Sequence, residues 1–286
     1  MNNEKELYKG LIPFISCKDF SVSKESYELL LNPDYEMMVT LPVPLDLENY
    51  YESEEYISHT DANNSLIDKV YQKVRRYTLQ QKLKLINSFN SSDKKLLDIG
   101  SGTGDFLNVC KQNNWDVFGV EPNPQAREIS KKKNVQVVES LNQLEENNFD
   151  VITLWHVLEH VENLLEYIAI LQQKLKPNGT LIIAVPNYNS FDANYYKEYW
   201  AAFDVPRHLW HFSQKSISKL FSKVSMQVEK TIPMKFDSFY VSLLSEKYKS
   251  GKNNFLKAFY VGLRSNLKAK STSEYSSLIY VIKNEK

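Results

Sequence analysis

The segment 96–121 constrains the fold of this 286-residue chain more than any other. It reads as a short apolar strand, a turn, a helical pattern and a second apolar strand that ends in Glu121. Glycine lets the backbone turn sharply and lets a ligand approach without a Cβ in the way, so this order is typical of nucleotide-binding proteins. The turn has three glycines at alternate positions, Gly100, Gly102 and Gly104.

The spacing of these glycines favours one class of nucleotide over another. Dinucleotide-binding turns read G-x-G-x-x-G, whereas the third glycine here comes one residue early. The acidic residue Asp98 stands two positions before the first glycine. A carboxylate at this place suits a positively charged ligand and suits a phosphate poorly.

The rest of the chain continues the alternation of strands and helices. Because parallel strands joined by helices form a sheet with both faces covered, the sequence predicts an α/β fold. Further strands are expected at 135–138, 149–154, 180–185, 226–232 and 277–282, and helices at 63–89, at 164–175 and after the N-cap residue Ser213.

Two domains and two insertions are expected. Residues 1–61, interrupted by prolines, predict a small N-terminal cap, and residues 62–286 predict the main domain. Residues 186–212 and 233–275 are too long for simple connections, which favours functional loops. Residues 255–267 predict an apolar helix face opposite basic residues, either as a lid or as a contact in a homodimer. In the helix at 63–89, Lys82 is expected on the solvated face.

Composition excludes several classes of partner. Lysine plus arginine equals aspartate plus glutamate at 35 each, so no overall attraction for nucleic acid or for an anionic membrane is expected. The two cysteines, Cys17 and Cys110, form no C-x-x-C pair, so neither a disulfide framework nor a metal site is expected. No apolar run predicts a membrane span or a signal peptide, and the sequence therefore predicts a cytoplasmic protein.

Six motifs in order resemble those of the class I S-adenosylmethionine-dependent methyltransferases. The resemblance covers residues 94–232 and is nearest to the ubiquinone-biosynthesis-type O-methyltransferases. It implies a Rossmann-like sheet of seven mostly parallel strands, with an antiparallel last strand and helices on both faces. The motifs are Leu97–Gly104, Gly119–Pro122, Phe149–Ile152, Val157–Val161, Leu175–Gly179 and Val185–Asn187.

The same resemblance implies roles for individual residues toward S-adenosylmethionine. The glycine turn with Ser101 would line the methionine part, and Asp98 would reach its ammonium through water. Glu121, followed by Pro122, would accept hydrogen bonds from the ribose hydroxyls. The adenine would lie between Ser140 and Leu141, and the transferred methyl beside Trp155 and His156.

Methyl transfer to a hydroxyl also needs a base for the acceptor's proton. The candidate bases are His156, His160, His208 and His211, with structural capping an equal alternative for His160. His208 and His211 lie with Asp204 in the aromatic loop 186–212. We expect this loop to form the pocket of a small-molecule acceptor, with His208 as base.

Three alternatives stay open at this stage. A cofactor-binding sensor or scaffold without turnover would keep the same motifs, and a nicotinamide-dependent oxidoreductase is disfavoured by the glycine spacing. A methyltransferase acting on nucleic-acid amino groups would resemble a family with an Asn- or Asp-Pro-Pro-aromatic motif after the fourth strand. Residues 154–157 instead read Leu-Trp-His-Val, which argues against that class.

Related chains often open with a zinc ribbon, but Cys17 alone cannot hold zinc, so a cap without metal is expected. By the resemblance Tyr51 and Tyr56 either cover the cofactor or simply pack.

Overall fold

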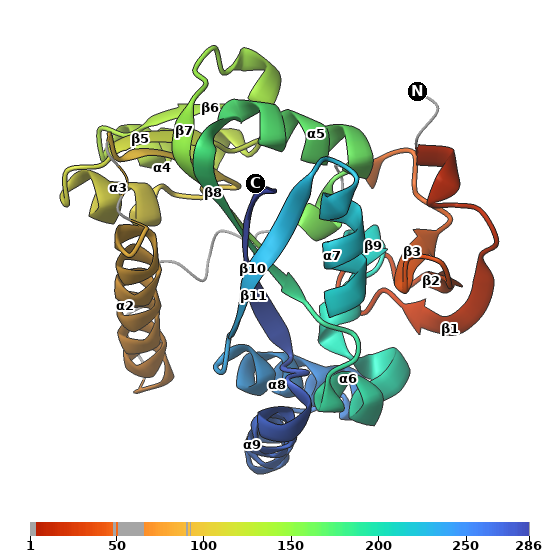
Figure 1. Cartoon of the computed structure of the whole chain (residues 1–286). Helices are drawn as coiled ribbons and strands as arrows, with labels where there is room; N and C mark the ends of the chain where they lie inside the picture. The colour runs from red at the N-terminus through yellow and green to blue at the C-terminus, as the bar shows by residue number, and fades with distance from the viewer. Residues whose placement is uncertain (1–3, 48–49, 51–65, 90, 92, 286) are drawn as a thin grey trace. The chain divides into compact units, whose positions relative to one another are not determined.

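The computed structural model describes residues 4–47, 50, 66–89, 91 and 93–285 (Figure 1). The chain divides into two compact units. The glycine-turn unit comprises residues 52–155 and 171–182, and the histidine unit comprises residues 1–51, 156–170 and 183–286. The predicted domain boundary at residues 61 and 62 lies outside the described residues, as do Tyr51 and Tyr56.

The predicted seven-stranded sheet is confirmed. Its strands follow the order β10-β11-β8-β7-β4-β5-β6, in which β4 pairs in parallel with β5 and β7, and β5 pairs in parallel with β6. The last strand, β11, is antiparallel to β10. The strands are β4 (Lys95–Ile99), β5 (Asp116–Val120), β6 (Gln136–Val138), β7 (Phe149–Trp155), β8 (Leu175–Pro186), β10 (Met226–Pro233) and β11 (Ser277–Asn284).

Buried apolar strands form the core of the glycine-turn unit. Leu96, Leu97, Phe149 and Val151 are fully buried, as expected for parallel strands that are covered on both faces. The helix predicted over 63–89 is one continuous helix. The helices around these strands are α2 (Leu66–Asn87), α3 (Asp105–Lys111) and α4 (Pro124–Lys131), with the 3-10 turn η3 at Leu141–Gln143.

The histidine unit has an antiparallel sheet of its own. Its order is β1-β2-β3-β9, so that the short β9 from the loop 186–212 pairs with the N-terminal strand β3. The strands are β1 (Ile12–Lys18), β2 (Ser26–Asn32), β3 (Met37–Leu41) and β9 (Trp210–His211). The helices are α5 (Leu164–Lys174), whose last residues belong to the other unit, α6 (Phe191–Tyr196), α7 (Gln214–Ser222), α8 (Asp237–Ser250) and α9 (Phe255–Thr272), with 3-10 turns η1 (Glu4–Glu6), η4 (Leu158–His160), η5 (Lys197–Tyr199) and η6 (Ala201–Phe203).

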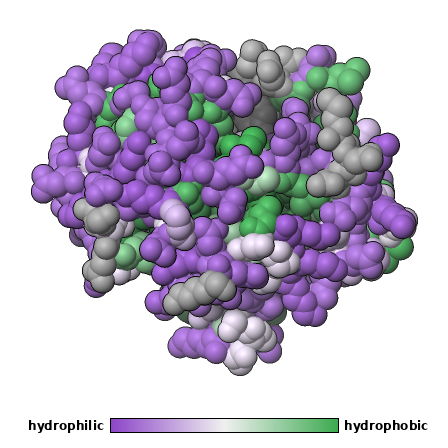
Figure 2. Space-filling view, turned by 45° about the horizontal axis from the view of Figure 1, so that its top comes forward, coloured by the Kyte–Doolittle hydropathy of each residue, from purple (hydrophilic) through white to green (hydrophobic). Residues whose placement is uncertain are grey.

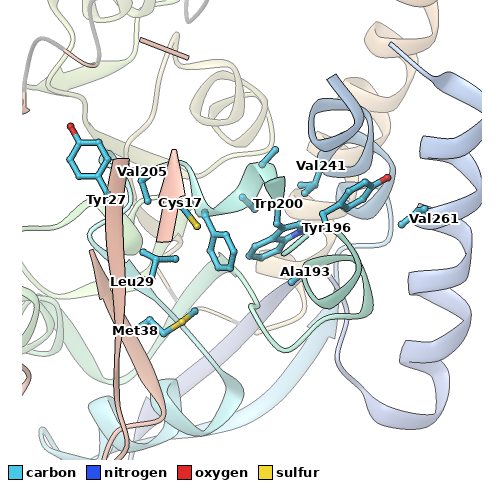
Figure 3. Packing of buried hydrophobic residues seen from close by; sticks show 13 residues of the cluster. Cys17, Tyr27, Leu29, Met38, Ala193, Tyr196, Trp200, Val205, Val241 and Val261 are labelled. Carbon is cyan, nitrogen blue, oxygen red and sulfur yellow. The ribbon is translucent and has the colours of Figure 1, made fainter. Parts of the chain in front are cut away.

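The aromatic loop 186–212 packs into the core of the histidine unit. Figure 3 shows Trp200 from this loop between Cys17 of β1 and Val241 of α8, with Tyr196 beside it. The buried carboxylate of Asp192 fixes the loop through three hydrogen bonds. It accepts them from Trp200 Nε1 at 2.8 Å, Ser265 Oγ at 2.6 Å and Ser276 Oγ at 2.6 Å. The loop is therefore a rigid part of the unit, which suits residues that must be held in place.

Candidate functional site

The glycine turn is tied by its backbone to the end of the neighbouring strand β5. The N–H groups of Gly100 and Ser101 donate to Val120 O at 2.8 and 3.0 Å. The N–H of Gly102 donates to Glu121 Oε2 at 2.8 Å. The turn between β4 and α3 and the acid that ends β5 therefore form one hydrogen-bonded unit.

Gly102 and Gly104 need glycine for different reasons. Both have positive φ, at 54° and 74°, a conformation that side-chain-bearing residues adopt only with strain. A Cβ at Gly104 would lie 2.8 Å from Ser130 Oγ and 2.9 Å from Val135 Cγ2, so this position serves packing. A Cβ at Gly102 would meet nothing within 4 Å. The space beside Gly102 is open, as an approaching ligand requires.

Glu121 is a buried acid, with 3% of its surface exposed. Besides the bond from Gly102, its Oε1 accepts the N–H of Asn123 at 2.9 Å. Burial raises its pKa, and the two backbone hydrogen bonds oppose that rise. Since a carboxylate has about four acceptor positions, two remain for hydroxyl donors of a ligand.

Asp98 lies on β4 with its carboxyl group inside the unit. Its Oδ1 accepts the hydroxyl of Thr153 on β7 at 2.6 Å. Burial raises the pKa of Asp98 to about 6, while the Thr153 bond and the charge of Lys82 oppose the rise. Because burial destabilises the carboxylate form of Asp98, a cation that comes close stabilises it strongly.

Lys82 supplies such a cation, and it is not on a solvated face as predicted. Its ammonium lies 4.1 Å from the centre of the Trp155 ring and 5.8 Å from that of Phe106. The two rings meet edge to face at 5.9 Å. An acid and two aromatic faces together stabilise positive charge. S-adenosylmethionine carries an ammonium and a sulfonium, so these residues fit its chemistry.

Two buried polar atoms in the glycine-turn unit have no hydrogen-bond partner among the described residues. They are Ser101 Oγ in the turn and Trp155 Nε1 at the end of β7. An unpaired buried donor costs about 1–3 kcal/mol, so each is a candidate for a bond to a ligand. Both were singled out as cofactor-binding residues from the sequence.

The residues expected near the adenine and ribose lie just after the carboxyl ends of β6 and β5, as predicted. Ser140 precedes η3, where its hydroxyl makes no capping hydrogen bond, and Leu141 beside it is buried. Pro122 is exposed directly after Glu121. These placements agree with the predicted roles, which remain predictions.

His156 begins the histidine unit, directly after Trp155. Its Nε2 lies 3.2 Å from Asp237 Oδ2 and its Nδ1 lies 3.4 Å from Glu159 Oε1. Although burial works against the charge, these two carboxylates raise the pKa of His156 to about 10. The imidazole is therefore protonated at neutral pH and cannot accept a proton there. A base must be neutral before it accepts a proton, so the predicted role of His156 as a base requires the neutral imidazole rather than this charged one.

His208 has the opposite electrostatics. Burial first, and then the neighbouring His160, lowers its pKa well below the ordinary value. Its Nδ1 lies 2.9 Å from Ala202 O and so carries the proton, which leaves the lone pair on Nε2. The Nε2 atom lies 3.7 Å from Asp204 Oδ2. The imidazole is therefore neutral at neutral pH with its Nε2 lone pair oriented, and its lowered pKa makes it a weaker base than an exposed histidine.

His160 and Glu159 lie beside His208. The rings of His160 and His208 meet edge to face with centres 4.6 Å apart, and His160 Nδ1 lies 2.9 Å from Arg207 O. Each of the three residues offers one atom to a group that spans less than 4.8 Å. Among the described residues this group has the ligand types for a divalent cation, whereas the sequence predicted no metal site.

His211 and Asp204 hold the loop together. The hydroxyl of Thr40 on β3 donates to His208 O at 2.6 Å and lies 2.8 Å from His211 Nε2. Since that hydroxyl has a single hydrogen, Nε2 of His211 is the donor in the second bond. Burial lowers the pKa of His211 to about 3. Asp204 pairs with Arg207 at 2.6 Å and faces His208.

A hollow of about 440 Å³ opens in the histidine unit beside the aromatic loop. Phe20 stacks on Tyr248 at its edge with ring centres 4.9 Å apart, and Tyr199 of the loop also lines it. None of the candidate histidines lines this hollow. The predicted contribution of the loop to an acceptor pocket therefore stays a prediction.

Residues 71–231 match the model of a family described as a methyltransferase domain. The chain belongs to this family. The matched residues contain the glycine turn, Glu121 and all candidate bases. The prediction of a class I S-adenosylmethionine-dependent methyltransferase is confirmed. The alternative of a nicotinamide-dependent oxidoreductase is set aside, because the family match, like the glycine spacing, is that of methyltransferases.

Curated relatives of this methyltransferase share only part of their length with it. The mitochondrial ubiquinone biosynthesis O-methyltransferase of Schizosaccharomyces pombe is 34% identical over 105 residues, which cover 32% of this chain and 38% of that protein. The ubiquinone biosynthesis O-methyltransferase of Rickettsia bellii is 27% identical over 150 residues, which cover 49% and 62%. The chain thus spans less than two thirds of the length of these relatives.

Solved structures agree on the fold of the methyltransferase. Magnesium protoporphyrin IX methyltransferase from Synechocystis PCC 6803 matches with a TM-score of 0.56 at 14% identity, over 83% of this chain and 97% of that one. A protein titled as a sarcosine dimethylglycine methyltransferase from Galdieria sulphuraria matches with 0.51 at 13% identity, over 73% and 84%. At these identities the likeness shows the fold alone.

Three functional candidates emerge only from the structure. Lys82 is one of several basic residues on its helix, and no sequence signal marks it. Asp237 begins α8, 81 positions after His156 in the chain, so their contact depends on tertiary structure. Glu159 lies in a recognised motif without a predicted role, and its burial beside three histidines depends on the tertiary structure.

Proposed function

We propose that this methyltransferase transfers the methyl group of S-adenosylmethionine to an oxygen of a small-molecule acceptor, with His208 as the general base. The observation that carries the proposal is His208 itself, a neutral buried histidine with its lone pair on Nε2. The names of the O-methyltransferase relatives support an oxygen acceptor. When bound, S-adenosylmethionine supplies a methyl group on a positively charged sulfur.

In the glycine-turn unit, the protein holds the cofactor. Glu121 accepts the ribose hydroxyls through the oxygen positions that its two backbone hydrogen bonds leave over. The open side of Gly102 admits the methionine part, and Asp98 with the ring of Trp155 stabilises its positive charge. Ser101 Oγ and Trp155 Nε1, which lack partners among the described residues, gain them from the ligand.

In the histidine unit, the protein moves the proton. His208 Nε2 takes the proton of the acceptor hydroxyl while an oxygen lone pair forms the new bond to the methyl carbon. S-adenosylmethionine, when bound, would supply the methyl carbon and would keep the electron pair of the carbon–sulfur bond on its sulfur. The carboxylate of Asp204, 3.7 Å from Nε2, stabilises the imidazolium that results.

Turnover by His208→Gln tests this proposal. The probe acceptors are catechols and matched aromatic amines, and release of S-adenosylhomocysteine is measured by mass spectrometry. We expect turnover on hydroxyl acceptors only, and a loss of about a hundredfold or more in kcat for His208→Gln with unchanged cofactor affinity. His211→Gln is the matched control and should keep most of the activity of the folded protein.

Three results would count against the proposal. Undiminished kcat in His208→Gln would exclude this histidine as the base. Tight binding of S-adenosylhomocysteine without turnover on any probe would favour the sensor or scaffold instead. Transfer to amines alone would move the acceptor class from oxygen to nitrogen.

A further inference from the structure

Helix α9 presents its large apolar side chains outward and its small ones inward. Leu256 is 87% exposed, and the outward set covers an arc of roughly 140° at 3.6 residues per turn. Soluble helices bury such a stripe. The outward residues are Phe255, Leu256, Phe259, Tyr260, Leu263 and Leu267, and the buried ones are Ala258, Val261, Gly262, Ser265 and Ala269.

Close packing against α8 fixes this orientation. A Cβ at Gly262 would lie 2.8 Å from Phe239 Cδ1, and Ser238 Oγ donates to Gly262 O at 3.1 Å. Val261, next to this glycine, reaches the buried cluster of the histidine unit (Figure 3). The helix cannot turn its large residues inward without losing this contact, so their exposure is built into the fold.

The outward face is also basic. Helix α9 contains four lysines and arginines and no acidic residue. The whole segment 233–275 contains eight basic residues against three acidic ones, although the net charge of the chain is zero. Each of the three acids has a partner within the protein: Asp237 pairs with His156, Glu246 with Lys257, and Glu274 with Asn187. Since Lys257 is neutralised by Glu246, the positive charge beside the apolar stripe comes from the exposed residues Arg264, Lys268 and Lys270.

We propose that the outward face of α9 binds the surface of an anionic lipid bilayer, with the helix lying in the plane of the interface. Large apolar residues flanked by lysine and arginine are the composition of interfacial helices. Among the described residues, no helix is long and apolar enough to cross a membrane, so the contact is with one leaflet only. Hydrophilic side chains dominate the face seen in Figure 2. Six large apolar residues exposed on one helix form a patch of the kind that marks an interaction site.

Other occupants fit less well. In a homodimer formed through α9, two copies of the same positive face would oppose each other across the interface. Nucleic acid would use the basic residues but would leave the exposed leucines in water. The zero net charge of the whole chain predicted no membrane partner. That total does not reveal the local excess of basic residues in segment 233–275.

Vesicle flotation of the 286-residue protein tests the proposal. The probes are vesicles of equal parts phosphatidylglycerol and phosphatidylcholine, and vesicles of phosphatidylcholine alone. We expect binding to the anionic vesicles only. The double variant Leu256→Gln with Leu267→Gln should weaken it by about tenfold or more, and so should Lys268→Gln with Lys270→Gln.

The control is Leu45→Gln, because Leu45 is a fully exposed leucine outside α9. It should bind vesicles like the unchanged protein, and circular dichroism should show each variant folded. Absence of binding to anionic vesicles, or equal binding by the Leu256 and Leu267 variant, would overturn the proposal. A concentration-dependent dimer that this variant dissociates, without vesicle binding, would instead assign the face to a second copy.

Discussion

The backbone N–H of Gly102 donates a hydrogen bond to Oε2 of Glu121 across 2.8 Å. The bond joins the middle of the glycine turn to the acid that ends the next strand, 19 residues later in the chain. One carboxylate thus shapes the turn and keeps acceptor positions for a ligand. The effect of substitutions in the turn should therefore divide between folding and ligand binding.

Alanine at Gly102 and at Gly104 should have different effects. Gly102→Ala costs about 1 kcal/mol of unfolding free energy from its positive φ, but it fills the open side of the turn. It should fold and lose affinity for S-adenosylhomocysteine. Gly104→Ala adds clashes with Ser130 and Val135 and should cost about 2–5 kcal/mol. Urea unfolding and calorimetric titration measure both quantities; equal ligand affinity in Gly102→Ala and the unchanged protein would contradict this reading.

Lys82→Met should strengthen the binding of S-adenosylmethionine more than that of S-adenosylhomocysteine. The variant removes a cation from the ring of Trp155, where the proposed site receives the charged sulfur or ammonium. Only S-adenosylmethionine carries the sulfonium, so its Kd should fall by about fivefold relative to the Kd of S-adenosylhomocysteine. Lys84→Met on the same helix is the control. An unchanged ratio would place the sulfonium elsewhere.

Asp237→Asn should lower the pKa of His156 from about 10 toward the ordinary value near 6.5. The charged pair stabilises the folded protein fully below pH 6.5, and this contribution is lost as pH rises toward 10. Titration of the His156 ring protons by NMR measures the shift directly. Glu229→Gln, which breaks the surface pair with Lys283, should leave the His156 titration in place. A His156 that titrates near pH 6.5 in the unchanged protein would refute the pairing.

His211 should make the protein sensitive to acid. The pKa of His211 is about 3 in the folded protein and about 6.5 in the unfolded chain, so the unfolded chain binds a proton that the folded chain excludes. Stability is then lost as pH falls below 6.5, at about 1.4 kcal/mol per pH unit from this one residue. His211→Gln, which can keep a bond to Thr40, should reduce the slope between pH 6 and pH 4 by that amount. Urea unfolding at several pH values provides the slope, and parallel curves would contradict the assignment.

The sheet and its glycine turn were predictable because local signals agree with the fold there. The strand from Lys95 to Ile99 ends at the glycine turn, and every later strand of the seven-stranded sheet overlaps its predicted range. Burial on both faces makes such strands readable without tertiary information. The motif order then identified the family.

Other features depend on contacts that no local pattern records. Strand β9 is only Trp210–His211 and exists because β3 offers it a partner. The helix from residue 255 was foreseen, yet the sequence alone could not tell which way its apolar face points, since Gly262 fixes the orientation through α8. Likewise, the charge of His156 depends on Asp237, far along the chain, and a histidine has no fixed protonation state without its neighbours.

Glu121 is the residue on which the cofactor assignment depends most. Calorimetric titration with S-adenosylhomocysteine compares the unchanged protein, Glu121→Gln and the control Glu139→Gln. Glu139 is a nearby acid on the surface, paired with Arg127. We predict binding by the unchanged protein and by Glu139→Gln, and a loss of about tenfold or more in Glu121→Gln. No binding by the unchanged protein, or equal affinity in Glu121→Gln, would contradict the account.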